Sequence, residues 1–339
     1  MLNQAIISLK TLKQNALKIK KQLPKTCKFC AVVKSNAYGH GLVECASALY
    51  KIVDCYSVSN VEEGVRLRLA GIDKDILVLS PFIKHDAETA LKYNLILSVD
   101  DVTDLKFLNS KAKKHKYLFK IHLKINTGMN RLGIDNLEEL KEFLEQLRLC
   151  KNVKLDGVYS HYSNPKNRKA LERQTDKFLL AINLIKSYNI SVTKHISASG
   201  GFLQGKYFDM VRIGILLYGY TPFTTNKISV KPVMKVNSMV LKTRTLKKGQ
   251  TALYGDKKAK KDQKVAIVPY GYADGLQRKS TKDIFNNRCM NLTALKSSCK
   301  KGKNITIMGN ADIQASKNKT ISYEVLTTCS IRAEKVYRR

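Results

Sequence analysis

The 339-residue chain contains no tryptophan and only six prolines. Its 27 acidic residues are outnumbered by 61 lysines and arginines. It has no apolar run approaching the ~18 residues that a membrane-spanning helix needs, so we expect no membrane partner. A composition of 44% hydrophobic and 26% charged residues excludes disorder throughout the chain. It is typical of a globular protein of about two domains.

Export signals, disulfide frameworks and metal motifs are also missing. Residues 1–9 lack a basic segment and a long apolar core, so we expect a cytoplasmic location. Eight cysteines are too few for a disulfide scaffold of this length, and we expect reduced thiols. The Cys27-x-x-Cys30 pair has no partner pair, and no other spacing indicates a metal site.

The shortage of acidic residues leaves a formal net charge of +34. Lysine and arginine neutralise phosphates, so this charge is compatible with a nucleic-acid-binding protein. However, the lysines are scattered or crowd into expected loops such as 113–116 and 257–261, without aromatic recognition runs or zinc-finger spacing. We therefore expect no nucleic-acid partner and a solvated basic surface.

Short β-rich runs alternate with amphipathic stretches over the first two thirds of the chain. Strands are predicted at 28–34, 54–59, 75–80, 95–99, 117–125, 153–160, 193–198 and 209–218. Helices are predicted at 11–23, 41–51, 61–70, 85–93, 137–150 and 168–188. Eight parallel strands close a (β/α)8 TIM barrel. The rival doubly wound sheet lacks the G-x-G-x-x-G expected after its first strand.

The pattern changes after a linker at residues 221–225. Period-two alternation dominates over 232–244, 264–270, 304–308 and 320–328, without long helical periodicity. We therefore predict an α/β protein with a barrel over 1–222, followed by a mostly β domain over 223–339.

Functional residues of such a barrel lie at the C-terminal ends of its strands. The first strand ends in Lys34, before a polar, glycine-rich segment. Burial would lower the pKa of this lysine and make its amine a usable nucleophile, whereas the alternative is a lysine that simply reaches solvent. Later strand ends and turns add Tyr38, Arg131, His161, Ser199 and Arg212. This set suits a carboxylate substrate and a phosphate-bearing cofactor.

Four motifs together resemble the alanine racemase family. They are Ala31–Gly41 (AVVKSNAYGHG), Thr127–Gly133, Arg212–Gly219 and Gly271–Gly275 (GYADG). The resemblance implies pyridoxal 5'-phosphate as the cofactor and a head-to-tail homodimer whose β domains complete each other's active sites. It implies an enzyme, an isomerase, that interconverts L- and D-alanine through a pyridoxal-phosphate aldimine and supplies D-alanine for peptidoglycan.

The resemblance also implies roles for individual residues. Lys34 would carry the cofactor, and Arg212 would face its pyridine nitrogen. The cofactor phosphate would be held by Tyr38, Ser199 and the amides of Gly214 and Ile215. Arg131 would contact the substrate carboxylate or the cofactor's phenolic oxygen, oriented by a carbamate on Lys124. His161 would hydrogen-bond Tyr272, and the backbone of Met290 would bind the substrate carboxylate.

Racemisation removes a proton from one face of Cα and delivers one to the other, which favours two bases. By resemblance these are Lys34 and Tyr272 of the partner subunit; a single swinging base is the alternative. A broader, serine-type racemase and a non-catalytic pyridoxal-phosphate-binding protein are the alternative functions. Four positions depart from the family pattern, namely Asn126, Ala198, Asn291 and Ile331. We expect Ile331 at the place of a tyrosine that binds the phosphate and narrows the entrance.

Overall fold

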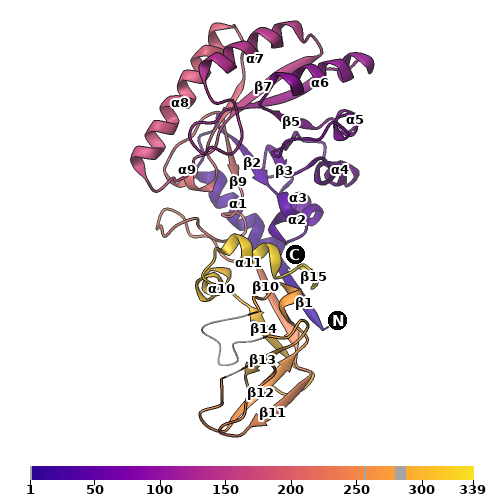
Figure 1. Ribbon diagram of the computed structural model, residues 1–339, viewed down its shortest axis with the longest axis vertical. Helices are drawn as coiled ribbons and strands as arrows, with labels where there is room; N and C mark the ends of the chain where they lie inside the picture. Colours follow the sequence, from indigo (N-terminus) through magenta and orange to yellow (C-terminus); the bar gives the residue numbers. More distant parts are fainter. Residues whose placement is uncertain (1, 256, 279–287) are drawn as a thin grey trace.

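The computed structural model describes residues 2–255, 257–278 and 288–339, which form a barrel and an elongated β-rich part below it (Figure 1). Eight parallel strands make the barrel in the order β8-β7-β6-β5-β4-β3-β2-β9. They are β2 (Lys28–Val32), β3 (Cys55–Val58), β4 (Ile76–Val78), β5 (Ile96–Val99), β6 (Phe119–Lys124), β7 (Val153–Tyr159), β8 (Thr193–His195) and β9 (Met210–Ile213). A bridge between Ala198 and Arg212 joins the two ends of this order. Each strand lies inside its predicted range, which confirms the predicted barrel.

Helices surround these strands (Figure 1). They are α1 (Leu9–Gln22), α2 (Lys34–Tyr38), α3 (Leu42–Leu49), α4 (Val61–Leu69), α5 (Asp86–Lys92), α6 (Val102–Lys114), α7 (Leu137–Leu149), α8 (Arg168–Ser187) and α9 (Ser199–Leu203). Several begin where a side-chain oxygen accepts a hydrogen bond from the amide three residues on, as at Asn60, Asp101 and Asn136. Within the described ranges, no helix is long and apolar enough to cross a membrane.

The β-rich part contains two sheets. One has the order β14-β10-β1-β15 and the other the order β11-β12-β13. Their strands are β1 (Asn3–Ser8), β10 (Met234–Met239), β11 (Lys242–Leu246), β12 (Gln263–Val268), β13 (Thr293–Lys296), β14 (Asn304–Met308) and β15 (Glu334–Arg338). The sequence analysis did not predict β1, which pairs antiparallel with β10 and parallel with β15. The two ends of the chain therefore share one sheet.

One segment of the β-rich part was predicted wrongly. Residues 320–328 were interpreted as a strand, but α11 (Ser322–Thr328) occupies them, and α10 (Ala311–Asn318) precedes it. The side chain of Asn310 accepts hydrogen bonds from the first-turn amides of α10. A helix of seven residues makes about two turns, too few for a helical period to stand out from the sequence.

Candidate active site

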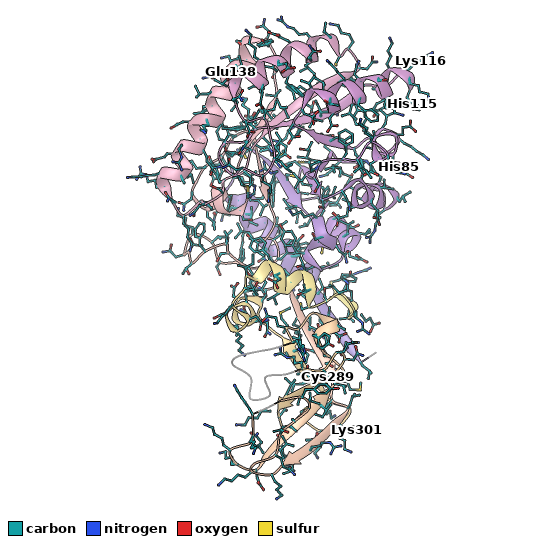
Figure 2. The ribbon with its side chains drawn as sticks, in the orientation of Figure 1. His85, His115, Lys116, Glu138, Cys289 and Lys301 are labelled. Atoms are coloured by element: carbon teal, nitrogen blue, oxygen red, sulfur yellow. The ribbon has the colours of Figure 1, made fainter. Side chains whose placement is uncertain are left out.

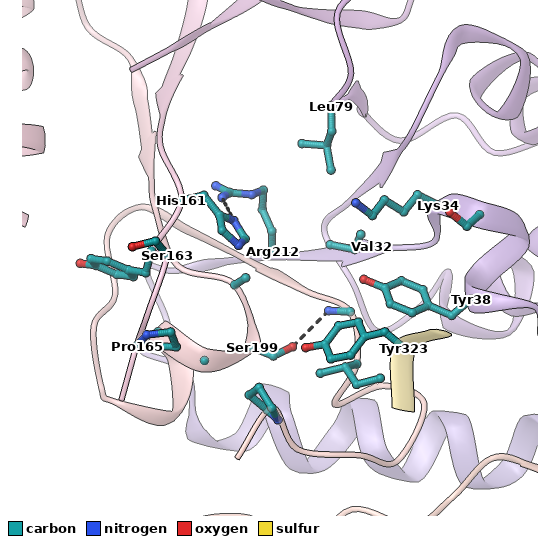
Figure 3. A pocket seen from close by; sticks show the side chains of 18 of the residues that line it. Val32, Lys34, Tyr38, Leu79, His161, Ser163, Pro165, Ser199, Arg212 and Tyr323 are labelled. Atoms are coloured by element: carbon teal, nitrogen blue, oxygen red, sulfur yellow. Dashed lines mark hydrogen bonds between the residues drawn. The ribbon is translucent and has the colours of Figure 1, made fainter. Parts of the chain in front are cut away.

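A cavity of about 920 Å³ opens at the C-terminal ends of the barrel strands (Figure 3). It is lined by nine of the predicted site residues: Lys34, Tyr38, Lys124, Arg131, His161, Ser199, Arg212, Gly214 and Ile215. They come from six segments of the chain and meet because parallel strands bring their C-terminal ends to one side of a barrel. Tyr272 and Met290 do not line this cavity.

Lys34 follows β2 and begins an unusual turn. Residues 35–38 all have positive φ, between 53° and 54°, the left-handed region that disfavours side chains larger than glycine. Glu63 stabilises this turn, since its carboxylate accepts hydrogen bonds from the amides of Asn36 at 2.9 Å and Ser59 at 2.8 Å. Burial and the charge of Arg131 lower the pKa of Lys34. A lysine amine with a lowered pKa can act as a nucleophile.

One end of the cavity gathers hydroxyl and amide groups (Figure 3). The amide of Gly214 donates to Oγ of Ser199 at 3.3 Å, and a Cβ at position 214 would collide with the hydroxyl of Tyr38. Glycine at 214 therefore allows hydroxyl and backbone groups to converge closely. Tyr323, from α11, also lines this end, with its ring centroid 6.0 Å from that of Tyr38. This arrangement, here called the phosphate cradle, is chemically able to hold a phosphate.

The expectation for Ile331 was wrong. Its side chain is 65% exposed and does not line the cavity, whereas Tyr323 does. Sequence reasoning missed Tyr323 because the segment containing it was interpreted as a strand. Its position on a short helix that packs near Tyr38 depends on tertiary contacts that no local pattern reports.

Arg212 is buried between the strands and is clamped by hydrogen bonds. Its guanidinium donates to the carbonyl of Ser160 at 2.6 Å and to Nδ1 of His195 at 2.5 Å. His195 Nε2 lies 2.9 Å from Nδ1 of His122. Nδ1 of His161 lies 3.4 Å from the second terminal nitrogen of Arg212 (Figure 3). Since arginine only donates, His195 must accept at Nδ1 and carry its proton on Nε2.

These histidines are neutral near pH 7. Burial, followed by the Arg212 charge, lowers the pKa of His161 to about 3 and that of His195 well below its usual value. Burial lowers the pKa of His122 to about 4. Among the described residues, no carboxylate lies within ion-pair distance of Arg212. Its positive charge therefore remains uncompensated inside the barrel.

A second cationic group lies across the cavity. Burial and the nearby Arg131 lower the pKa of Lys124 to about 8. Lys124 and Arg212 both face the ring of Tyr159, with Nζ at 5.5 Å and Cζ at 5.1 Å from its centroid. With Lys34, four cations line the cavity, and Glu324 is the one carboxylate among its described lining residues. The cavity therefore favours anionic ligands.

Tyr272 and Met290 lie together elsewhere, on the β-rich part. The amides of Tyr272 and Ala273 donate to the carbonyls of Cys289 at 3.2 Å and Met290 at 3.0 Å. Side chains of Tyr272 and Met290 are 36% and 55% exposed. Figure 2 places Cys289 in this part, away from the barrel. Tyr272 and Met290 thus lie on one surface, and that surface does not face the cavity of the same chain.

Comparison with known proteins decides the family. The model described as alanine racemase, N-terminal domain, matches residues 7–222, and the model for the C-terminal domain matches residues 233–337. The chain belongs to the alanine racemase family. It is thus a pyridoxal-phosphate-dependent racemase, an isomerase that interconverts L- and D-alanine.

Individual racemases are similar along most of the chain. The alanine racemase of Thermodesulfovibrio yellowstonii is 34% identical over 98% of this chain and 97% of that protein. That of Treponema denticola is 38% identical over 81% of this chain and 76% of that protein. The solved Clostridium difficile alanine racemase has a TM-score of 0.94 at 28% identity, covering 100% of this chain and 96% of that one.

The departures from the racemase motifs have local structural partners. The side-chain amide of Asn126 donates to Asp135 at 2.5 Å, which an aspartate at 126 would instead repel. Asn291 accepts a hydrogen bond from Arg332 at 3.1 Å, beside the exposed tyrosine turn. Ala198 lines the cavity and bridges to the Arg212 strand. None of these three displaces a cavity residue that the motifs predict.

The described residues also fit the racemase cofactor. The partly buried amine of Lys34 suits the aldehyde of the cofactor. The hydroxyls and amides around Gly214 suit its phosphate, and the uncompensated charge of Arg212 suits its ring nitrogen. Within the described ranges, no group of three or more His, Cys, Asp or Glu side chains could bind a metal ion.

Proposed function

We propose that Lys34 and Tyr272 of the partner subunit are the two bases of this alanine racemase. The observation that carries the proposal is the division of the predicted site. Lys34 lies in the cavity of the barrel, whereas Tyr272 is exposed on the β-rich part, outside the cavity lining. A two-base site then needs a second copy, so we infer a head-to-tail homodimer with shared active sites.

Lys34 would attach the cofactor and move the proton on one face of the substrate. When bound, pyridoxal phosphate withdraws electrons from the amino acid and acidifies its Cα–H bond. The lowered pKa of Lys34 gives its amine a neutral fraction, which can accept that proton at Nζ. Tyr272 of the partner subunit would give or take the proton on the other face through its phenol oxygen.

Five groups would bind the cofactor phosphate by hydrogen bonds. These are the hydroxyls of Tyr38 and Ser199, the backbone amides of Gly214 and Ile215, and, as an addition, the hydroxyl of Tyr323. Arg212 would lie at the ring nitrogen, where its positive charge disfavours protonation of that nitrogen. The neutral His195 and the carbonyl of Ser160 fix the guanidinium in this position.

Arg131 would bind the substrate carboxylate or the phenolic oxygen of the cofactor, and the backbone of Met290 of the partner subunit would bind the carboxylate. Lys124 would react with CO2 through its neutral amine, forming an N–C bond and releasing one proton. Its pKa of about 8 supplies that neutral amine near physiological pH. The resulting carbamate would pair with Arg131, whose charge otherwise faces another cation.

We infer that the product D-alanine serves peptidoglycan and that the enzyme works in the cytoplasm. The broader, serine-type alternative rested on an open entrance at Ile331, and that residue lies outside the cavity lining. A non-catalytic pyridoxal-phosphate-binding protein would have no use for the exposed tyrosine turn of the β-rich part. Neither alternative has a structural observation in its favour.

The test follows optical rotation and Cα deuterium together, with the purified protein, pyridoxal phosphate and L-alanine in D2O. Falling rotation with deuteration at Cα shows racemisation of alanine, and the two-base assignment further requires that Lys34→Ala and Tyr272→Phe each lose it. With bound cofactor verified by absorbance, constant rotation without deuteration on alanine would contradict it. The same assay on L-serine measures substrate breadth.

A further inference from the structure

Positive charge is distributed unevenly along the chain. Residues 1–222 contain 35 lysines and arginines against 20 acidic residues, whereas residues 223–339 contain 26 against 7. Although it is half as long, the C-terminal part therefore carries the larger net charge. The four cations of the cavity all belong to the other part of the chain and do not explain this excess.

Within the β-rich part, the excess collects at one place, here called the basic tip. It comprises residues 242–255, 257–264 and 296–303. Thirteen lysines and arginines in it are exposed: Lys242, Arg244, Lys247, Lys248, Lys257, Lys258, Lys260, Lys261, Lys264, Lys296, Lys300, Lys301 and Lys303. Asp262 is the one acidic residue among them, and it pairs with Lys247 at 2.8 Å.

The described residues of the basic tip form one folded surface. Thr243 donates to the carbonyl of Cys299 at 2.6 Å, and the amide of Ser297 donates to the carbonyl of Lys264 at 3.2 Å. Residues 296–303 therefore lie beside the strands β11 and β12. A small core that includes Leu246 and Val265 packs beneath the loop. The cations are therefore presented by an ordered scaffold.

The basic tip lies far from the barrel. Figure 1 shows β11 and β12 at the lower end of the molecule, and Figure 2 labels Lys301 there and Lys116 at the opposite end. The loop before β12 and the turn containing Tyr272 after it are at opposite ends of that strand. Lys301 and Lys303 lie nearer the Tyr272 end, since the amide of Gly302 donates to the carbonyl of Val240 and the next amide, of Leu241, donates to the carbonyl of Ile267. A partner at the loop would thus leave Tyr272 accessible.

The residue types indicate the kind of partner. Twelve of the thirteen cations are lysines, which act as hydrated point charges rather than as bidentate phosphate readers. Among the described tip residues, Tyr254 is the one large exposed ring, at 72% exposure, and one ring offers no row of stacking sites for bases. A tyrosine among lysines instead suits the headgroup level of an anionic membrane.

We propose that the basic tip binds the surface of an anionic phospholipid bilayer by electrostatic attraction, without insertion of a helix. This departs from the expectation of no membrane partner, which rested on the lack of a spanning helix alone. The tip of a second copy is a poorer occupant, because its thirteen exposed cations would repel those of the first. The inference does not depend on the identity of the two catalytic bases. It also accounts for the excess of lysine and arginine in residues 223–339.

The experiment measures sedimentation of the full-length protein with vesicles of phosphatidylcholine, with or without phosphatidylglycerol. The test variant replaces four lysines of the tip loop: Lys257→Gln, Lys258→Gln, Lys260→Gln and Lys261→Gln. The matched control removes the same charge from the barrel: Lys113→Gln, Lys114→Gln, Lys116→Gln and Lys151→Gln. We expect binding only to phosphatidylglycerol vesicles, weakened by salt and reduced at least about tenfold in the test variant alone.

Three results would overturn the proposal. They are equal binding to phosphatidylcholine vesicles, equal loss in both variants, and displacement of the protein from its vesicles by a single-stranded RNA oligonucleotide at a lower phosphate concentration than by added phosphatidylglycerol vesicles. The last result would assign the tip to nucleic acid. Retained racemase turnover shows that each variant folds. If the loop variant does not fold, replacing Lys296, Lys300, Lys301 and Lys303 by glutamine repeats the test on the other segment.

Discussion

Arg212 donates a hydrogen bond to Nδ1 of His195, and the two nitrogens are 2.5 Å apart inside the barrel. Because His195 accepts at this nitrogen, it stays neutral and cannot offset the guanidinium charge. The pair therefore presents a fixed cation to the cavity. A carboxylate at the position of His195 would cancel that charge. A neutral histidine therefore holds the guanidinium in place and leaves its positive charge available to the cavity.

Replacing this cation tests its influence on its neighbours. We expect Arg212→Gln to lower turnover by about 10²–10³-fold, the range typical of a lost preorganised charge. Since the Arg212 charge lowers the pKa of His161 and His195, both should rise in the variant. Imidazole NMR titration measures this. Arg148→Gln, at a surface arginine that stacks on Tyr188, is the control. Unchanged histidine titration would contradict the electrostatic role.

Lys34 and Lys124 are both partly buried lysines of the cavity, and only the first is assigned to the cofactor. Lys34→Ala should lose covalent cofactor and lower turnover by about 10²–10⁴-fold or more, as for a lost base. Lys124→Ala should retain the covalent cofactor. Borohydride reduction followed by mass spectrometry separates the two. Reduced cofactor on the Lys34→Ala protein would refute the assignment.

Carbamylation of Lys124 has its own readout. ¹³C-bicarbonate should give a carbamate carbon signal in the wild-type protein that Lys124→Ala lacks. Acidification should remove the signal, because protonation of the amine near its pKa of about 8 competes with reaction with CO2. An identical signal in both proteins would place the adduct elsewhere.

Shared active sites predict complementation between two inactive proteins. In the proposed dimer, Lys34→Ala would lack one base and Tyr272→Phe the other, and a mixed dimer would contain one site with both. Mixing after mild dissociation should therefore restore turnover. Tyr117→Phe, at an exposed tyrosine of the barrel, should stay active and serves as the control. A mixture as inactive as its components would argue against a site completed by the partner.

The position of Tyr323 predicts a cofactor-affinity effect. Tyr323→Phe removes one hydroxyl beside the phosphate cradle, and a hydrogen bond to a charged group contributes about 1.5–3 kcal/mol. The dissociation constant for pyridoxal phosphate should thus rise about tenfold or more. Ile331→Ala should leave it unchanged, since that side chain is exposed outside the cavity lining. The reverse pattern would restore the original expectation for Ile331.

Buried histidines predict acid sensitivity of the fold. Burial lowers the pKa of His40 and His122 to about 4, from an ordinary value of 6.5. As the pH falls below 6.5, the unfolded chain binds more protons at these histidines than the folded chain does. The free energy of unfolding is therefore at its full value above pH 6.5 and decreases toward pH 4. Each histidine contributes about 1.4 kcal/mol per pH unit.

Urea unfolding between pH 7 and pH 4 measures this loss. The exposed His115 supplies the control, and His115→Gln should follow the wild-type curve. A midpoint that stays constant as the pH falls would show that the buried histidines gain protons without cost.

Most of the barrel was predictable because each of its strands and most of its long helices have a residue pattern that can be recognised within a short stretch of sequence. Each strand is a short β-rich run, and the six predicted helices have an apolar face whose period survives in the sequence, whereas α6 was not predicted. The motif around Lys34 was predictable for the same reason, since the residues that shape its turn are consecutive. The convergence of the nine predicted cavity residues followed from the rule that strand ends meet on one side of the barrel.

Three features depended on tertiary structure alone. The strand β1 pairs with β10 and β15, whose residues lie more than 200 positions away. The helix that brings Tyr323 to the phosphate cradle is too short to have a period of its own. The hydrogen bonds from Arg212 to Ser160 and His195 join strands that sequence order separates, and only closure of the barrel brings them together. By itself, the sequence determined the types of chemical group present, whereas long-range packing decided which of them lie within reach of one another.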